Sequence, residues 1–360
     1  MKPQFWQDKR VFITGITGFK GGWLSHWLNK MGAIIYGYAL KPPTQPNIFE
    51  VTNVSNSVHT EIGDIRDFIC LKNAIDSFQP DIIFHLAAQP LVRYSYVQPI
   101  ETYETNVMGT VNLLEAIRQN GGVRVVINVT SDKCYENQEW VWGYREHEAM
   151  GGYDPYSNSK GCAELVTSAF RNSFFNVNEY EKHGVALASV RAGNVIGGGD
   201  WADDRLIPDI LRSIELNKPI LIRSPHAIRP WQHVLEPLSG YIQLAEKLWY
   251  DATAFSEGWN FGPSDDDARN VQWIAERIVK LWGHGASWQL DESIHPHEAH
   301  YLKLDCSKAR SKLGWTPRWS LENTLERIVL WHKAHNDGMD MKSYTLEEIK
   351  AYEQTIVKES

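Results

Sequence analysis

A strand, a glycine-rich turn and a helix follow one another near the start of the chain, and this order limits the fold more than any other feature. Residues 9–14 form an apolar run bounded by charge, which predicts a short buried strand. Gly15, Gly18 and Gly21 follow it, and the apolar positions after them recur at helical spacing. Glycines let the backbone approach a pyrophosphate, whose charge the N-terminus of a helix favours. The segment predicts the first unit of a dinucleotide-binding sheet. Its Gly-x-x-Gly-x-x-Gly spacing alone is also compatible with a purely structural turn.

Strand-like and helix-like segments alternate as far as about residue 190. The apolar runs that predict further buried strands are 33–39, 81–88 and 123–129, and a helical pattern begins at Asn106. This alternation predicts an α/β fold with a Rossmann-type, doubly wound parallel sheet. Beyond Val190, glycines and prolines mark loops, and helical patterns resume at 206–216 and 234–250.

The change of pattern at Val190 suggests two domains. We expect residues 1–190 to form an NAD-binding Rossmann domain, to which a segment near 234–258 returns. We expect residues 191–233 and 259–360 to form a smaller C-terminal lobe that binds the substrate.

The second predicted strand ends without the acid that usually binds a ribose 2′-hydroxyl. It runs into Leu40-Lys41-Pro42-Pro43, where no Asp or Glu stands. Lys41 would suit a 2′-phosphate, so these residues leave the choice between NAD and NADP open. Asp64, after the third strand-like stretch, would accept a hydrogen bond from an adenine amine, or act as a helix N-cap or turn acid.

A tyrosine and a lysine four residues apart provide a candidate catalytic pair. On a helix, Tyr156 and Lys160 share one face. We expect Lys160 to lower the pKa of the Tyr156 phenol, because a nearby cation favours the phenolate. A phenolate beside a sugar hydroxyl is a base for oxidising an alcohol. Ser131, at the carboxyl end of strand 123–129, is placed to hold the same hydroxyl. Such pairs arise often by chance, and the glycine motif is what makes this one a candidate.

Asp132 and Lys133 are not needed for that oxidation. A carboxylic acid beside an amine indicates a second reaction, in which a proton is removed next to a carbonyl group and water is lost.

Composition excludes several classes of function. A net charge of −8 argues against a nucleic-acid partner. No run of about 18 apolar residues predicts a membrane span, and the first residues lack the apolar core of a signal peptide, so a cytoplasmic protein is expected. The four cysteines fit no metal-binding spacing and are expected to be free thiols. His295, His297 and His300 cluster, but we expect a solvated or substrate-facing loop and no metal site.

Together these residues resemble the extended short-chain dehydrogenase/reductase superfamily, whose members act on nucleotide sugars. The Asp-Lys pair at 132–133 is similar to that of CDP-glucose 4,6-dehydratases, whereas the dTDP-glucose enzymes carry Thr-Asp-Glu at 131–133. The stretches that agree with the CDP-glucose enzymes are 18–25, 88–93, 131–135, 191–201, 229–234 and 297–305.

The resemblance implies a role for each catalytic residue. Tyr156 would take the proton of the glucose 4-hydroxyl as hydride leaves C4 for NAD, while Lys160 would hold the nicotinamide ribose. Lys133 would remove the C5 proton and Asp132 would protonate the departing 6-hydroxyl. Return of the hydride to C6 would give CDP-4-dehydro-6-deoxy-D-glucose.

The motif and the resemblance also imply binding residues. The expected NAD contacts are Gly15, Thr17, Gly18, Phe19, Lys20, Gly21, Asp64, Ile65, Leu86, Ala87, Ala88, Asn106, Tyr156 and Lys160. The expected contacts with CDP-glucose are Gln89, Arg93, Asn194, Arg205, Leu206, Arg229 and Tyr301. Arg229 is the strongest phosphate candidate, because a guanidinium binds phosphate through two parallel hydrogen bonds. The resemblance further implies a homodimer or homotetramer packed through helices that include residues 156–160.

Two other functions remain compatible with parts of this pattern. A 4-epimerase would share the glycine motif, Tyr156 and Lys160, but would not need Asp132 and Lys133. A dinucleotide-sensing protein without enzymatic activity would usually lack the tyrosine–lysine pair. No residue of the sequence identifies the contact with cytosine.

Overall fold

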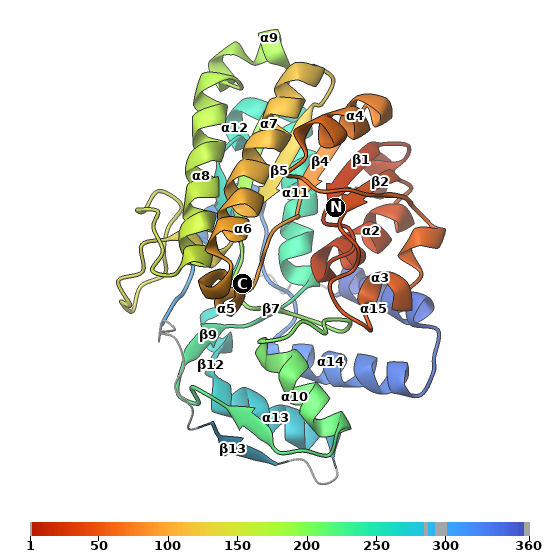
Figure 1. Cartoon of the computed structure of the whole chain (residues 1–360), viewed down its shortest axis with the longest axis vertical. Helices are drawn as coiled ribbons and strands as arrows, with labels where there is room; N and C mark the ends of the chain where they lie inside the picture. The colour runs from red at the N-terminus through yellow and green to blue at the C-terminus, as the bar shows by residue number, and fades with distance from the viewer. Residues whose placement is uncertain (1, 284–286, 292–300, 356–360) are drawn as a thin grey trace.

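A parallel sheet of seven strands forms the centre of the larger domain (Figure 1). The computed structural model of the chain describes residues 2–283, 287–291 and 301–355. The strands, in their order across the sheet, are β11 (Gly258–Asn260), β6 (Ala186–Arg191), β5 (Val125–Val129), β4 (Ile82–His85), β1 (Arg10–Thr14), β2 (Ile34–Ala39) and β3 (His59–Ile62). Every neighbouring pair is parallel. The chain adds β2 and β3 on one side of β1 and then crosses to place β4 on the other side, so the strand order switches between β1 and β4. In open α/β sheets, ligands bind at the carboxyl ends of the strands at such a switch point.

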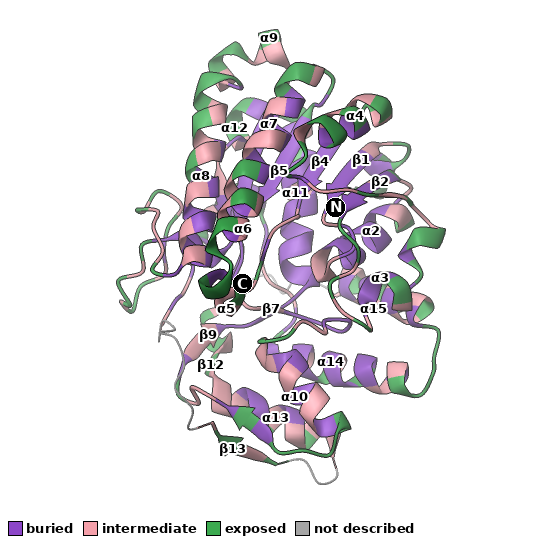
Figure 2. Cartoon of the chain, in the orientation of Figure 1, coloured by how far each residue is buried: buried purple, intermediate pink, exposed green. Residues whose placement is uncertain are grey.

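Helices cover both faces of this sheet. Val11 and Ile13 of β1 point into one hydrophobic core, and Phe12 between them points into the other, because successive strand residues face opposite sides. The first core includes α2 (Phe19–Lys30) and α11 (Leu235–Tyr250); the second includes α4 (Phe68–Phe78) and α7 (Gly109–Asn120), with α8 (Pro155–Ser173) beside them. Figure 2 shows the strands buried between helices whose outer faces are exposed. The predicted doubly wound sheet is confirmed.

The smaller lobe lies below the sheet in Figure 1 and has a hydrophobic core of its own. Its main helices are α10 (Leu206–Glu215), α13 (Val271–Trp282) and α14 (Leu321–Asn336). Two-stranded sheets complete it: β8 (Ile220–Ile222) with β13 (Trp288–Leu290), and β9 (Ile228–Pro230) with β12 (Ala268–Asn270). A further short pair, β7 (Val195–Ile196) with β10 (Gln232–His233), joins the segment that leaves β6 for the lobe to the segment that returns from the lobe to α11.

The remaining helices are short, apart from α15. They are α1 (Pro3–Trp6), α3 (Ile48–Val51), α5 (Val92–Val97), α6 (Pro99–Tyr103), α9 (Tyr180–His183), α12 (Ala252–Phe255), α15 (Met341–Gln354), the 3-10 turns η1 (Val54–Asn56), η3 (Asp132–Cys134), η4 (Val177–Glu179) and η5 (Asp265–Asp267), and the π-helical turns η2 (Glu104–Met108) and η6 (Ala309–Leu313).

Three elements that follow lobe segments in the sequence, α11, β11 and α15, pack on the larger domain. Helix α11 packs against β5 and β6, and β11 extends the sheet beside β6. Helix α15 packs on α2, where the rings of Tyr352 and Trp27 meet at 5.6 Å and Trp27 Nε1 donates to Glu353 Oε1 at 2.8 Å. Residues 259–260 and α15 therefore lie on the larger domain, although the sequence pattern grouped them with the lobe.

Most predicted elements match the structure within a few residues, and the differences are local. Strand β4 ends at His85, so Leu86–Ala88 form a loop beyond it. Asn106 lies in the π-helical turn η2 and α7 begins at Gly109. All four cysteines are free, as expected. Within the described ranges, no helix is long and apolar enough to cross a membrane.

Candidate active site

The loop between β1 and α2 is shaped to receive a phosphate. Gly18 is the N-cap of α2 and its position supplies no side-chain acceptor, so the first backbone N–H groups of the helix are available to a ligand. A Cβ at Gly15 would lie 2.7 Å from Ala87 N, and one at Gly21 would lie 2.3 Å from Gly15 O. Gly15 also has φ +74°, which favours glycine. These glycines let the loop pack closely against its own backbone and Ala87, and the open N–H groups at the start of α2 fit a dinucleotide pyrophosphate.

Next to β2 and β3, the predicted dinucleotide contacts Thr17 and Asp64 have their side chains hydrogen-bonded within the protein. Thr17 Oγ1 donates to Leu40 O at 2.9 Å. The Asp64 carboxylate accepts the backbone N–H of Arg66 and two guanidinium bonds from the same residue. The helix N-cap role belongs to Asp67, which accepts from Cys70 N. Asp64 is thus a turn acid paired with an arginine, and its contact with adenine stays a prediction, as does that of the buried Ile65.

Two predicted contact residues have their side chains engaged within the protein. Asn106 accepts from Gln89 N and donates to Gln89 O and Ser159 Oγ, all within 3.0 Å. Gln89 donates to Leu91 O and Thr102 Oγ1 and accepts from Leu91 N. Asn106 therefore links the loop after β4 to α8 through hydrogen bonds. Gln89 and Asn106 support the walls of the site, and their side chains already have partners within the protein. Leu86, Ala87 and Ala88 of that loop are half-buried and face the glycine turn through the contact of Ala87 with Gly15.

Three cations converge on the glycine loop. Lys20, in the first turn of α2, is half-buried, and burial together with the charges of Arg205 and Lys160 lowers its pKa to about 7. Asp132 acts in the opposite direction. Positive charges of this kind, gathered next to open backbone N–H groups, fit the two phosphates of a dinucleotide.

We expect the affinity for a dinucleotide to fall as the pH rises above about 7, because Lys20 then loses its proton. Bound pyrophosphate would raise the pKa of Lys20, so binding takes up a proton, and affinity changes by up to about tenfold per pH unit for each proton taken up. Titration calorimetry at about pH 6 and about pH 9 measures both quantities.

Lys20→Met should flatten this pH dependence. Lys160, whose pKa burial lowers to about 8, should account for what remains. An unchanged pH dependence in the variant would mean that Lys20 does not face the pyrophosphate.

Helix α8 begins with an acid followed by a proline, and this start sets the position of Tyr156 and Lys160. Asp154 is the N-cap and accepts from the backbone N–H and hydroxyl of Ser157, with Pro155 at the first helical position. Tyr156 and Lys160 then lie on one buried face of the helix. Lys160 Nζ donates to Val129 O at 3.4 Å, at the end of β5.

The predicted effect of Lys160 on Tyr156 is not what the structure shows. Burial raises the pKa of Tyr156 to about 12; Ser131 and Arg205 oppose the rise, while Asp132 adds to it. Burial outweighs the nearby cations because it removes water from the phenolate. Lys160, with its contact to Val129 O, is not among the main influences on the phenol.

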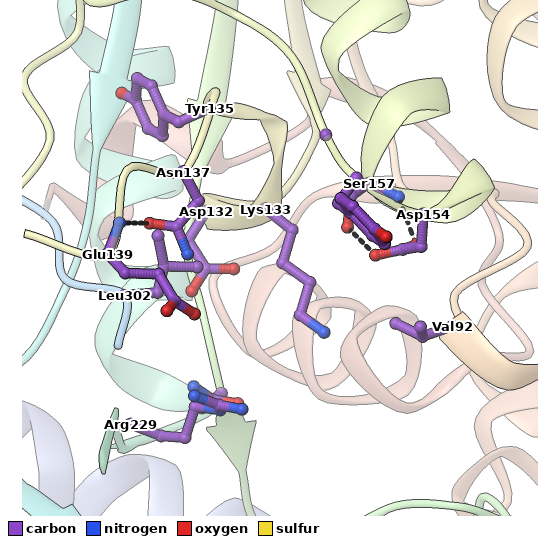
Figure 3. Close-up of a pocket in the computed structure, with 13 residues that line it drawn as sticks. Val92, Asp132, Lys133, Tyr135, Asn137, Glu139, Asp154, Ser157, Arg229 and Leu302 are labelled. Carbon is purple, nitrogen blue, oxygen red and sulfur yellow. Dashed lines mark hydrogen bonds between the residues drawn. The ribbon is translucent and has the colours of Figure 1, made fainter. Parts of the chain in front are cut away.

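The residues after β5 form the other wall of the site. Ser131 Oγ accepts from Lys133 N at 3.2 Å, which starts the turn η3, and donates to Asp132 Oδ1 at 3.1 Å. Asp132 is buried, and burial raises its pKa against the lowering effects of Lys133, Ser131, Arg229 and Lys20. Lys133 extends its amine into a pocket between Arg229 on one side and Val92 with Asp154 on the other (Figure 3). The site thus offers an acid that burial favours in its protonated form beside an amine that reaches the ligand space.

A buried ion pair supports this wall. Arg191 of β6 makes two parallel bonds to Glu164 of α8, at 2.8 and 2.9 Å, and Thr130 and Ser189 also donate to that carboxylate. The pKa of Glu164 falls to about 2, because these charges and hydrogen bonds outweigh its burial. Removing one partner of such a pair typically costs about 3–5 kcal/mol. The pair holds α8, and with it Tyr156, against the sheet.

The predicted substrate residues divide into two groups. Asn194 and Arg229 line the pocket of Lys133. Arg93 pairs with Asp204 at 2.9 Å and Arg205 with Asp200 at 2.9 Å, in the loop that leads to Leu206 at the start of α10. Tyr301 lies beside β9 and accepts from Asn137 Nδ2 through its carbonyl oxygen.

The sequence did not predict the other residues that line the pocket. They are Val92, Tyr135, Asn137, Glu139, Gly152, Tyr153, Asp154, Ser157 and Leu302. Only Asp154 carries a local signal, because an acid before proline marks a helix start. The three clustered histidines, 295, 297 and 300, lie outside the described residues, and the residues that are described contain no group of three or more metal-binding side chains.

Comparison with known proteins places these features in a family. The family model for GDP-mannose 4,6-dehydratase matches residues 12–328. CDP-glucose 4,6-dehydratase of Salmonella typhimurium is 66% identical over 348 residues, which are 97% of each chain. dTDP-glucose 4,6-dehydratase of Haemophilus influenzae is 23% identical, covering 89% of this chain and 97% of the relative.

Solved structures share the fold. dTDP-glucose 4,6-dehydratase from Bacillus anthracis, in complex with NAD, superposes with a TM-score of 0.75 at 20% identity, over 92% of this chain and 98% of the other. UDP-glucose 4-epimerase from Thermotoga maritima gives 0.78 at 20% identity, over 91% and 99%. Epimerases and dehydratases therefore have this fold in common, and the family model and the relative at 66% identity, not the fold, place the chain with the dehydratases. The chain belongs to the GDP-mannose 4,6-dehydratase family within the extended short-chain dehydrogenase/reductases, on the branch of the CDP-glucose 4,6-dehydratases.

Proposed function

We propose that this enzyme is a hydro-lyase that converts CDP-D-glucose into CDP-4-dehydro-6-deoxy-D-glucose with the help of bound NAD. The observation that carries the proposal is the pocket in which Asp132 and Lys133 face the ligand space, beside the buried pair Tyr156 and Lys160. A 4-epimerase needs only the tyrosine and lysine. The acid and the amine provide the additional proton transfers that dehydration requires.

The residues divide the proton transfers among them. NAD, when bound, accepts the hydride from C4 and gives it back at C6. Tyr156 takes the proton of the 4-hydroxyl, with Ser131 holding that oxygen. The resulting 4-ketone makes the C5 hydrogen acidic, and Lys133 removes it as a proton and gives a proton back to C5 when the hydride adds to C6. Asp132, whose pKa burial raises, gives its proton to the departing 6-hydroxyl, which leaves as water. Lys160, on the same buried face of α8 as Tyr156, binds the nicotinamide ribose.

The glycine loop supports NAD as the dinucleotide. Gly15, Gly18 and Gly21 allow the tight turn that leads to the open N-terminus of α2, and Lys20 in its first turn has a lowered pKa. Phe19 supplies a further backbone N–H in the first turn of α2. The end of β2 offers no carboxylate to a ribose 2′-hydroxyl, since Leu40 and Lys41 stand there.

We expect NAD to bind in preference to NADP, but more weakly than in relatives with an acid at the end of β2. One charge-assisted hydrogen bond contributes about 1.5–3 kcal/mol, or roughly ten- to a hundred-fold in affinity. Partial loss of NAD on purification should follow. Titrating both dinucleotides into stripped protein measures this directly, and tighter binding of NADP would overturn the choice of NAD.

The product formed from three sugar nucleotides tests the activity. Incubation with CDP-glucose, dTDP-glucose and UDP-glucose should give a 4-keto product, which absorbs in alkali, with kcat/KM higher by orders of magnitude for the CDP sugar. Cytosine differs from thymine and uracil in its exocyclic amine, and a site built to pair with a polar group rejects analogues that lack it. A 4-epimer as product would contradict the dehydratase, and similar kcat/KM values would contradict only the CDP preference.

Arg229→Ala provides the control for base selection. Arg229 would bind a phosphate that every sugar nucleotide carries, so the variant should raise KM for all of them. Loss of such a contact typically costs about 2–5 kcal/mol. The ratio of CDP-glucose to dTDP-glucose activity should stay close to that of the wild type.

The enzyme is further proposed to be a homodimer or homotetramer. Apolar side chains are exposed on neighbouring helices next to the catalytic helix: Val97 of α5, Ile100 of α6, Met108 of η2 and Leu165 of α8. Sedimentation at micromolar concentration measures the assembly, and a monomer would contradict it.

A further inference from the structure

Gly193 lies in contact with the carboxyl group of Asp132. It follows β6 at the carboxyl edge of the sheet, beside the turn that carries Asp132. A Cβ built on Gly193 would lie 1.7 Å from Asp132 Oδ2, 2.2 Å from Cγ and 2.9 Å from Oδ1. The three nearest atoms all belong to that one carboxyl group, and no other glycine in the described ranges has a closer neighbour.

The backbone conformation gives no reason for glycine here. Gly193 has no φ in the left-handed region, so an alanine would adopt the same backbone without strain. What excludes a side chain is the space that the Asp132 carboxyl occupies. The contact concerns a polar group of the pocket, since Asp132 lines it and is only 3% exposed.

Hydrogen bonds hold both partners in their present positions. Gln232 Nε2 donates to Gly193 O at 3.3 Å and to Phe261 O at 2.9 Å, and its backbone N–H donates to Asn194 O. Asn194 itself holds φ +43°, which is uncommon for a residue other than glycine, and β7 starts directly after it, paired with β10. Asp132 is fixed on its other side by Ser131 Oγ. The carboxyl is therefore enclosed between its own turn and the braced backbone of Gly193.

We propose that Gly193 is a positioning residue for the proton donor of the dehydration. Because Gly193 has no side chain, the Asp132 carboxyl can occupy the space beside it, which we call the seat, and from there it points toward the ligand space. The inference rests on the proposed role of Asp132. It adds that a single methyl group at position 193 turns this carboxyl away from its position, and that the oxidation carried out by Tyr156 does not need the seat.

Gly193→Ala separates the two half-reactions. In a single turnover with CDP-glucose, hydride transfer to NAD should persist and be visible as NADH absorbance. Formation of the 4-keto-6-deoxy product should fall by about 10²–10⁴-fold, the contribution typical of one acid–base group. Gly262→Ala is the matched control, because Gly262 follows the neighbouring strand β11 and its Cβ would meet only Cys306 Sγ at 3.3 Å and Leu304 beyond it. The control should keep wild-type kinetics.

Asp132→Ala and the double variant complete the test. If Gly193 acts through Asp132, adding Gly193→Ala to Asp132→Ala should change product formation by less than about threefold, whereas independent effects would multiply. The double variant should also recover any thermal stability that Gly193→Ala loses, because the carboxyl is then absent. Wild-type product formation by Gly193→Ala, or a double variant as unstable as Gly193→Ala, would overturn the inference. Full activity of Asp132→Ala would instead contradict the proposed role of Asp132.

Discussion

Tyr156→Phe is expected to lower kcat by about 10²–10⁴-fold, because it removes the proton acceptor and keeps the ring. The structure makes this a sensitive position. The phenol is buried, and its pKa is raised to about 12, so the enzyme depends on the charges around it to stabilise the phenolate. Steady-state kinetics with CDP-glucose measures the loss, and ligand titration should show that the nucleotide sugar still binds.

Tyr103→Phe is a suitable control for this variant. Tyr103 is partly buried and its hydroxyl donates to Asn158 on α8, so the substitution also deletes one hydroxyl against the catalytic helix. It should leave kcat unchanged within a few fold. If Tyr156→Phe behaved like this control, Tyr156 would not be the base.

Lys133→Ala should lower the rate of product formation by a similar factor, but it should leave the first step, hydride transfer from C4 to NAD, in place. The amine reaches into the pocket from the turn after β5, while Tyr156 acts from α8 (Figure 3). We therefore expect some reduction of NAD on addition of CDP-glucose, with product formation lower by about 10²–10⁴-fold. A single turnover in deuterium oxide, followed by NADH absorbance and by the isotope at C5, separates the two steps.

Lys133→Met distinguishes the loss of the amine from the loss of packing. Methionine keeps an unbranched side chain of similar length without a basic group, so it should resemble the alanine variant. Deuterium that still enters C5 at the wild-type rate in either variant would show that another group is the C5 base.

The sequence predicts best what depends on neighbouring residues. Strand β1, the glycine turn and α2 follow from one apolar run, three glycines and a helical pattern, and α8 starts at Asp154 and Pro155. The placement of Tyr156 and Lys160 on one face needs only the helical repeat. These features are local, so no tertiary contact is required to find them.

Features that depend on distant contacts were not predictable. The raised pKa of Tyr156 results from burial, which only the folded chain determines. Gln89 and Asn106 turned out to bond to each other and to the scaffold across 17 residues of sequence. The seat at Gly193 joins residues 61 positions apart on adjacent strand ends, and β7 and β10 are strands of two residues that no periodicity reveals.

The contact between α2 and α15 has a consequence for the order in which the protein can be assembled during synthesis. Trp27 and Glu353, which share a hydrogen bond, are 326 residues apart. At about 5–20 residues per second, the ribosome needs roughly 16–65 s to pass from one to the other. Through that interval the indole of Trp27 lacks both the Glu353 carboxylate and the Tyr352 ring that cover it in the finished enzyme. The helix at which the dinucleotide is expected to bind is thus among the first elements made and among the last to be fully covered.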